Sequence, residues 1–134
     1  MTRDYTDYIN DILNSIEEIE EFIEGMDFET FNSDRKTINA VIRSLEVMGE
    51  AATKIPTDIR EKYTDIPWSK MAGMRNKLIH EYFGVDLEIV WTVCTDEIPP
   101  IKPLLIEIQN NIKKESTTED EEEDSGTNQK VEAD

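Results

Sequence analysis

Apolar residues recur at intervals of three and four along most of this chain, and that spacing constrains the fold more than any other feature of the sequence. The first stripe consists of Tyr5, Ile9, Ile12, Ile16, Ile19 and Ile23. Such intervals place side chains on one face of an α-helix. The stripe therefore predicts a long amphipathic helix, with Asp4 as its capping residue and Gly25 as its stop.

A second stripe predicts another long helix, which starts near Ser33 or Asp34 and ends before Pro56. Its inward residues are expected to be Ile38, Val41, Ile42, Leu45, Met48, Ala52 and Ile55. Thr57 is expected to cap a short helical turn that reaches Tyr63.

The next helix is expected to run from Trp68 to about Tyr82, with Pro67 at its first position and Gly84 closing it. Asp86 can cap the following helix, whose buried residues are expected to be Leu87, Val90, Trp91, Cys94 and Ile98. The pair Pro99 and Pro100 then forces a kink or restart before a last helix that carries Ile101, Leu104, Leu105, Ile108 and Ile112. No segment alternates as a β-strand does, so the sequence predicts an all-α antiparallel bundle of four to five helices.

Charge divides the chain into two parts. The 134 residues carry a net charge of -17, and residues 115–134 alone hold nine acids and one Lys. Residues 1–114 are expected to form one helical domain, and residues 115–134 a disordered acidic tail with almost nothing apolar to bury. Because nucleic acid and anionic membranes attract excess Lys and Arg, any RNA chemistry in this chain must depend on a local cationic site.

The composition also limits compartment and cofactor. Cys94 is the single cysteine, which excludes an intramolecular disulfide framework, and no CxxC or Cys/His cluster suggests a zinc site. The N-terminus lacks the apolar stretch of a secretion signal, and no run approaches membrane-spanning length. We therefore expect a cytoplasmic protein that needs no membrane, metal or other cofactor.

The residues with the most distinctive chemistry lie between Arg75 and Tyr82. His80 is the only histidine, with an unperturbed pKa near neutrality, and Arg75 precedes it by five positions. On a helix this spacing separates the two side chains by about 140° around the axis and about 7.5 Å along it. They can converge on one phosphate, although a lone His near an Arg is more often a structural detail.

Other polar residues allow two interpretations each. Arg43, Glu46 and Glu50 have the spacing of surface salt bridges, which we favour over a polar network that supports the helix of Arg75. Asn76 can orient RNA or His80 through its amide, or can be an ordinary surface contact.

Three segments resemble the HepT-like branch of the HEPN superfamily. They are Ser44 to Glu50, Ile66-Pro67-Trp68, and Met74 to Asp86, and the similarity extends over roughly residues 5–112. The last segment contains Arg75, Asn76, His80 and Tyr82 at the positions of the family signature, which is Arg, a polar residue, three more residues, His, one residue and Tyr.

The resemblance implies a helical homodimer that acts as a metal-independent ribonuclease toxin. It also implies an MntA-like nucleotidyltransferase antitoxin that silences the toxin by transferring AMP to the motif tyrosine, which is Tyr82 here. Arg75 and His80 are then the expected catalytic residues, and Asn76 supports them. The acidic tail is not part of the family pattern.

The chemistry favours the same arrangement without the family. A metal-free ribonuclease needs a base for the 2'-hydroxyl proton, an acid for the leaving 5'-oxygen and a cation for the transition state. One chain has one histidine, so a two-fold dimer interface would supply both imidazoles.

Two other functions compete with this one. The first is a non-catalytic HEPN module that serves as the substrate-docking partner of a minimal nucleotidyltransferase, and the second is a plain helical dimerisation module. The intact set of Arg75, His80 and Tyr82 favours the ribonuclease, because a docking subunit has no evident need for all three.

Overall fold

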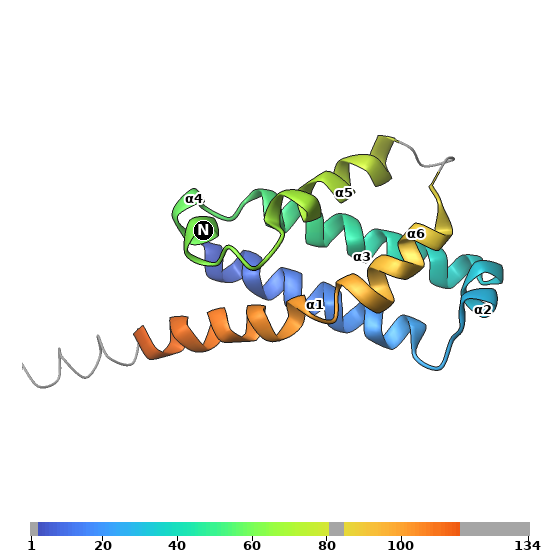
Figure 1. Ribbon diagram of the computed structural model, residues 1–134, viewed down its shortest axis with the longest axis horizontal. Coiled ribbons are helices and arrows are strands. Elements are labelled where there is room, and N and C mark those ends of the chain that lie inside the picture. The colour runs from blue at the N-terminus through green and yellow to red at the C-terminus, as the bar shows by residue number, and fades with distance from the viewer. Residues whose placement is uncertain (1–2, 81–84, 116–134) are drawn as a thin grey trace, which may run out of the picture.

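The computed structural model describes residues 3–80 and 85–115, without the side chains of Ile79 and His80 (Figure 1). Its elements are α1 (Tyr5–Ile23), α2 (Phe28–Ser33), α3 (Arg35–Thr53), α4 (Thr57–Lys62), α5 (Trp68–His80), α6 (Leu87–Thr92), the π-helical turn η2 (Val93–Glu97) and a last helix over 101–115. These residues contain no strand, which confirms the all-α prediction. The predicted tail lies outside the described residues, apart from Glu115 at the end of the last helix.

Helix α1 is formed as its apolar stripe predicts. Asp4 accepts hydrogen bonds from the backbone N–H groups of Thr6 and Asp7, while the Asp7 side chain bonds back to the N–H of Asp4, which makes a capping box. Ile9, Ile12, Ile16 and Ile19 are almost completely buried. Gly25 adopts a φ of 76°, a left-handed conformation that favours glycine, just beyond the end of the helix.

Helix α2 has no counterpart in the prediction, which left the residues between Gly25 and Ser33 without an element. Its N-cap is Asp27, whose side chain accepts hydrogen bonds from the backbone N–H and the hydroxyl of Thr30. The helix buries Phe31 completely, and this ring packs on Trp91 at a centroid distance of 5.1 Å. One aromatic side chain thus fixes a helix too short to show a stripe.

Helix α3 is the central element, because it packs against both α1 and α5. It starts after Asp34, which caps it by accepting from the N–H of Thr37, as the sequence predicts. Figure 1 shows α1 and α3 antiparallel, with α5 along the other side of α3. The core that joins these helices includes Ile12, Ile16, Val41, Leu45, Met48, Trp68, Met71 and Leu78.

The predicted cap of α4 is wrong by one position, whereas α5 begins at Trp68 as predicted. Pro56, rather than Thr57, occupies the N-cap of α4, and the hydroxyl of Thr57 accepts a hydrogen bond from Arg60 instead of capping the helix. Pro67 precedes α5, and its carbonyl accepts the N–H of Met71 at 3.0 Å. That bond is the first of the helical ladder, so Pro67 is an N-cap residue, where its missing N–H costs nothing.

The second half of the bundle follows the prediction closely. Asp86 caps α6 by accepting from the N–H of Glu88, and α6 continues directly into η2. The chain turns at Pro99 and Pro100 before the last helix. The predicted closure of α5 at Gly84 lies outside the described residues. Among the helices that the structure describes, none combines the length and apolar character needed to span a bilayer.

Candidate functional site

Arg75 lies at a close contact between α3 and α5. Gly49 on α3 faces Arg75 on α5, and a Cβ added at Gly49 would overlap the Cβ of Arg75 and lie 2.8 Å from the main-chain oxygen of Met71. Any side chain at position 49 would therefore force the two helices apart. The absence of a side chain on Gly49 determines where the Arg75 backbone sits.

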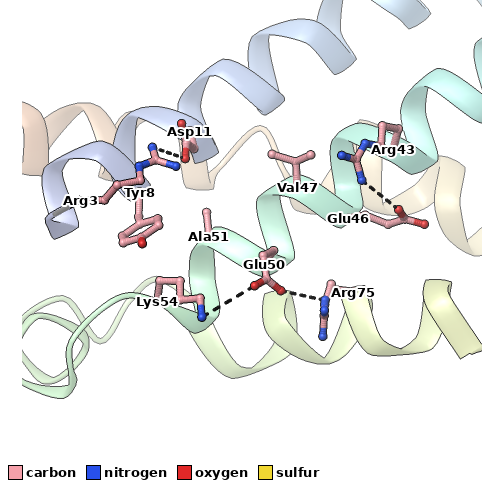
Figure 2. Close-up of a pocket in the computed structure, with 10 residues that line it drawn as sticks. All are labelled: Arg3, Tyr8, Asp11, Arg43, Glu46, Val47, Glu50, Ala51, Lys54 and Arg75. Atoms are coloured by element: carbon pink, nitrogen blue, oxygen red, sulfur yellow. Dashed lines mark hydrogen bonds and ion pairs between the residues drawn. The ribbon is translucent and has the colours of Figure 1, made fainter. Parts of the chain in front are cut away.

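The guanidinium of Arg75 is paired across the helix contact with Glu50. Its Nε lies 3.0 Å from Oε2 of Glu50, and the second oxygen of the same carboxylate lies 3.9 Å from Nζ of Lys54 (Figure 2). Nε is itself buried, and within the described residues its N–H finds no acceptor at hydrogen-bond geometry. The Arg75 to Glu50 contact is therefore an ion pair without a directed hydrogen bond from Nε.

Asn76 contacts the other side of the same guanidinium. The NH1 group of Arg75 donates a hydrogen bond of 2.9 Å to the side-chain oxygen of Asn76. Asn76 thus contacts Arg75, while its expected role of orienting RNA or His80 stays a prediction. The Arg75 side chain retains 34% of its accessible surface, so an incoming phosphate can reach it.

The other two predicted site residues are described only in part. His80 is the last residue of α5, one and a half turns after Arg75, but its side chain lies outside the described residues. Tyr82 lies outside them altogether. The structure therefore brings together Arg75 and Asn76, while the positions of the imidazole and the phenol remain predictions.

The acidic residues of α3 combine the two interpretations that the sequence allowed. Arg43 and Glu46 form the expected surface pair, at 3.6 Å with Arg43 largely exposed. Glu50 pairs with Lys54 one turn later, at 3.9 Å, which fits the preferred interpretation of a surface salt bridge, and it also reaches across to Arg75 at 3.0 Å. The contact with Arg75 adds the alternative, a polar link between α3 and the helix of Arg75, to these surface pairs. Spacing within α3 could not show this, because the partner lies on another helix.

A cavity of about 400 Å³ opens beside Arg75, between the start of α1, the second half of α3 and α5. Its lining includes four cations, which are Arg3, Arg43, Lys54 and Arg75, and three carboxylates, which are Asp11, Glu46 and Glu50. Figure 2 shows these side chains around one concave surface, with α3 in the middle. In a chain with a net charge of -17, this surface has a small excess of positive charge.

Each cation of this lining has an anionic neighbour. Arg3 donates a hydrogen bond of 2.7 Å to Asp11, which raises the pKa of its guanidinium, and it stacks on the ring of Tyr8 at 4.9 Å. Arg43 faces Glu46, and Lys54 shares Glu50 with Arg75. An anionic ligand in this cavity would therefore compete with these carboxylates for the cations.

Cys94 offers no second reactive group. Its thiol is buried in the core, and that burial raises its pKa to about 12, so it stays protonated at neutral pH. In residues 3–80 and 85–115, no three His, Cys, Asp or Glu side chains gather in a way that suits a metal ion.

Sequence reasoning missed the roles of Gly49 and Lys54. A glycine inside a long helix costs about 1 kcal/mol relative to alanine, which is the one sequence signal that pointed to a close helix contact at position 49. Lys54 gave no comparable signal, because its importance depends on a cavity formed by three helices.

Comparison with known proteins places this arrangement in context. The profile of a family described as "Ribonuclease HepT-like" matches residues 12–108. A protein named "Probable ribonuclease HepT" from Thermococcus cleftensis is 49% identical over 102 residues, which cover 76% of this chain and 93% of the relative. A protein named "Putative RNase" from Methanocaldococcus jannaschii is 52% identical over 100 residues, which cover 75% of this chain and 86% of the relative.

A third relative, from Caldanaerobacter subterraneus and also named "Putative RNase", is 44% identical over 101 residues, which cover 75% of this chain and 90% of the relative. No solved structure matches the chain.

Proposed function

The chain belongs to the ribonuclease HepT-like family, and from that premise we propose that it is a metal-independent ribonuclease and the toxin of a toxin-antitoxin pair. The observation that carries the proposal is the setting of Arg75. Its guanidinium is held by Glu50 and Asn76, partly exposed, at the edge of a cavity lined by four cations and three carboxylates in a strongly acidic protein. A planar guanidinium in such a place suits a phosphodiester, which it can bind through two parallel hydrogen bonds.

The reaction that fits these residues is transesterification by the RNA's own 2'-hydroxyl. A base removes the 2'-proton, the 2'-oxygen attacks phosphorus, and the bond from phosphorus to the 5'-oxygen breaks as that oxygen takes a proton. The products are a 2',3'-cyclic phosphate and a 5'-hydroxyl. Arg75 would neutralise the charge that builds on the phosphate oxygens, and His80 would transfer the protons.

In an in-line displacement the attacking 2'-oxygen and the leaving 5'-oxygen lie on opposite sides of phosphorus, so one His80 cannot contact both at the same time. We therefore place the site at a two-fold interface, where the helices around Trp68 to Tyr82 of two copies face each other and two histidines border one cleft. The cavity beside Arg75 would then open toward the RNA that lies in this cleft.

One preparation tests both parts of this proposal. The purified chain should cleave single-stranded RNA in excess EDTA, and the products should carry 2',3'-cyclic phosphate ends. Light scattering on the same sample should give about twice the chain mass of 15.5 kDa. A requirement for added Mg²⁺ or Mn²⁺, or full activity from a monomer at micromolar concentration, would contradict it. A chain that binds a nucleotidyltransferase but leaves RNA intact would instead be a docking subunit.

Control by AMP transfer to Tyr82 gives a second test. AMP on this tyrosine would add bulk and a phosphodiester charge close to Arg75, so it should exclude the RNA phosphate. Co-expression with the cognate MntA-like nucleotidyltransferase should raise the mass of the Tyr82 peptide by whole AMP units and remove ribonuclease activity. Tyr82→Phe should remain active in the presence of the partner. If the partner inhibits the Phe variant as fully as the parent, inhibition comes from binding alone.

A further inference from the structure

The cavity beside Arg75 has features that cleavage at Arg75 and His80 does not use. Lys54 and Arg43 border it from α3, one turn on either side of the Glu46 to Glu50 segment, and neither is needed for the transesterification described above. Their side chains are more than half exposed, at 53% for Lys54 and 75% for Arg43. They are cations in reach of a ligand that already contacts Arg75.

Glu50 marks where an anion fits in this cavity. Its two carboxylate oxygens are divided between Arg75 at 3.0 Å and Lys54 at 3.9 Å, so one anionic group already sits between the two cations. The phosphate of an RNA backbone resembles this carboxylate, because it also has two oxygens a similar distance apart that share one negative charge. Since Glu50 is 47% exposed, its side chain can swing toward solvent and leave this place to a phosphate.

We propose that this cavity binds the backbone of single-stranded RNA next to the cleaved bond, with one phosphate replacing the Glu50 carboxylate between Arg75 and Lys54. Arg43 then contacts the backbone farther along the strand. The proposal rests on the ribonuclease function and names a part of its substrate site. A volume of about 400 Å³ lies in the range of pockets that hold nucleotide-sized ligands, about 300–1,000 Å³, and a single strand can turn into a local concavity.

The test uses an oligoribonucleotide whose 2'-hydroxyls are methylated, so that it binds without being cut. Lys54→Ala is expected to weaken binding of this probe about 3- to 10-fold in fluorescence anisotropy at low salt. It should also reduce the dependence of log affinity on log salt by about 0.7, the value for one phosphate contact on a single strand. Glu50→Gln should act in the opposite direction and tighten binding, because it removes the carboxylate that competes for the two cations.

Lys62→Ala is the matched control. Lys62 is exposed to a similar extent, 57%, and pairs with one carboxylate, Glu115 at 3.6 Å, but it does not line the cavity. Equal binding by the Lys54 and Lys62 variants, or weaker binding by Glu50→Gln, would overturn the proposal. Loss of the dimer in Lys54→Ala would also overturn it, because the cavity would then hold a second copy of the chain.

These outcomes are separable from the ribonuclease proposal. If the parent cleaves RNA while Lys54→Ala binds the probe normally, the cavity proposal fails and the ribonuclease remains. If the parent binds the probe through Lys54 but cleaves no RNA, the binding site stands and the catalytic proposal fails.

Discussion

Replacing Arg75 with alanine should lower the rate of RNA cleavage by about 10²- to 10³-fold, since a transition-state cation contributes on that order. His80→Ala should lower it by about 10²- to 10⁴-fold through loss of proton transfer. Both variants should keep the helical circular dichroism spectrum of the parent. Arg75 is half-buried and pairs with the exposed carboxylate of Glu50, and a surface ion pair of this kind contributes only about 0–1 kcal/mol to stability.

Two companion variants give this experiment its controls. Arg35→Ala removes an exposed arginine from the first turn of α3, about 22 Å along the helix from Glu50, and should cleave at the parental rate. Arg75→Lys keeps the charge but loses the planar fork, so its rate should fall between those of the parent and the alanine variant. Parental activity in Arg75→Ala would remove the arginine from the mechanism.

Among residues that do not contact RNA, Gly49 is the one whose replacement by alanine should lower the cleavage rate and the stability most. The new methyl group overlaps the Cβ of Arg75 and crowds the Met71 carbonyl, so α5 must move away from α3. A displacement of about 1 Å at a reacting group can cost about 10²-fold in rate, and overpacking costs about 1–3 kcal/mol in stability. We expect both a loss of cleavage on that order and a lower melting temperature.

Gly73→Ala is the matched control for this glycine. Gly73 lies in α5, two residues before Arg75 and so on nearly the opposite side of that helix, and a Cβ there meets no atom within 4 Å among the described residues. Its substitution should raise the melting temperature by about 2–6 °C, because alanine is favoured over glycine in a helix by about 1 kcal/mol. A Gly49→Ala protein that melts at the parental temperature would show that α3 and α5 are not in close contact.

A double variant separates positioning from simple destabilisation. If Gly49 acts on catalysis through Arg75, then Gly49→Ala should reduce cleavage little further when Arg75 is already alanine. Its effect on the melting temperature should persist, because the Cβ at position 75 and the Met71 carbonyl that the new methyl group crowds are also present in the alanine variant. A full additional loss of activity in the double variant would mean that Gly49 acts by another route.

The helices were largely predictable because their signals are local. The stripe from Tyr5 to Ile23 and the cap at Asp4 specify α1 without reference to the rest of the chain, and the same holds for Asp34 and α3. Helix α2 was not predictable in this way, since six residues show no period and Phe31 is buried by Trp91, sixty residues later.

The sequence named the candidate site residues, whose roles stay predictions, but it did not predict the surroundings of Arg75. The motif pointed to Arg75 and Asn76, and the structure places them in contact. The partner of Arg75 is Glu50, which lies on a different helix. The cavity is lined by Arg3, just before the start of α1, and by Lys54, at the end of α3. Such juxtapositions come from how α1, α3 and α5 pack, and no spacing along a single helix encodes them.

The pairing of every cation around the cavity with a carboxylate has a kinetic consequence. Such pairs look nearly neutral from a distance, so the negative body of the protein dominates its long-range field and slows the approach of RNA. Moderate salt, with a Debye length of about 10 Å at 0.1 M, screens this repulsion and speeds the encounter, while the same salt weakens the contacts made on arrival. The charged side chains around the cavity therefore contribute to RNA binding only after the two molecules have met, and they do not accelerate the encounter.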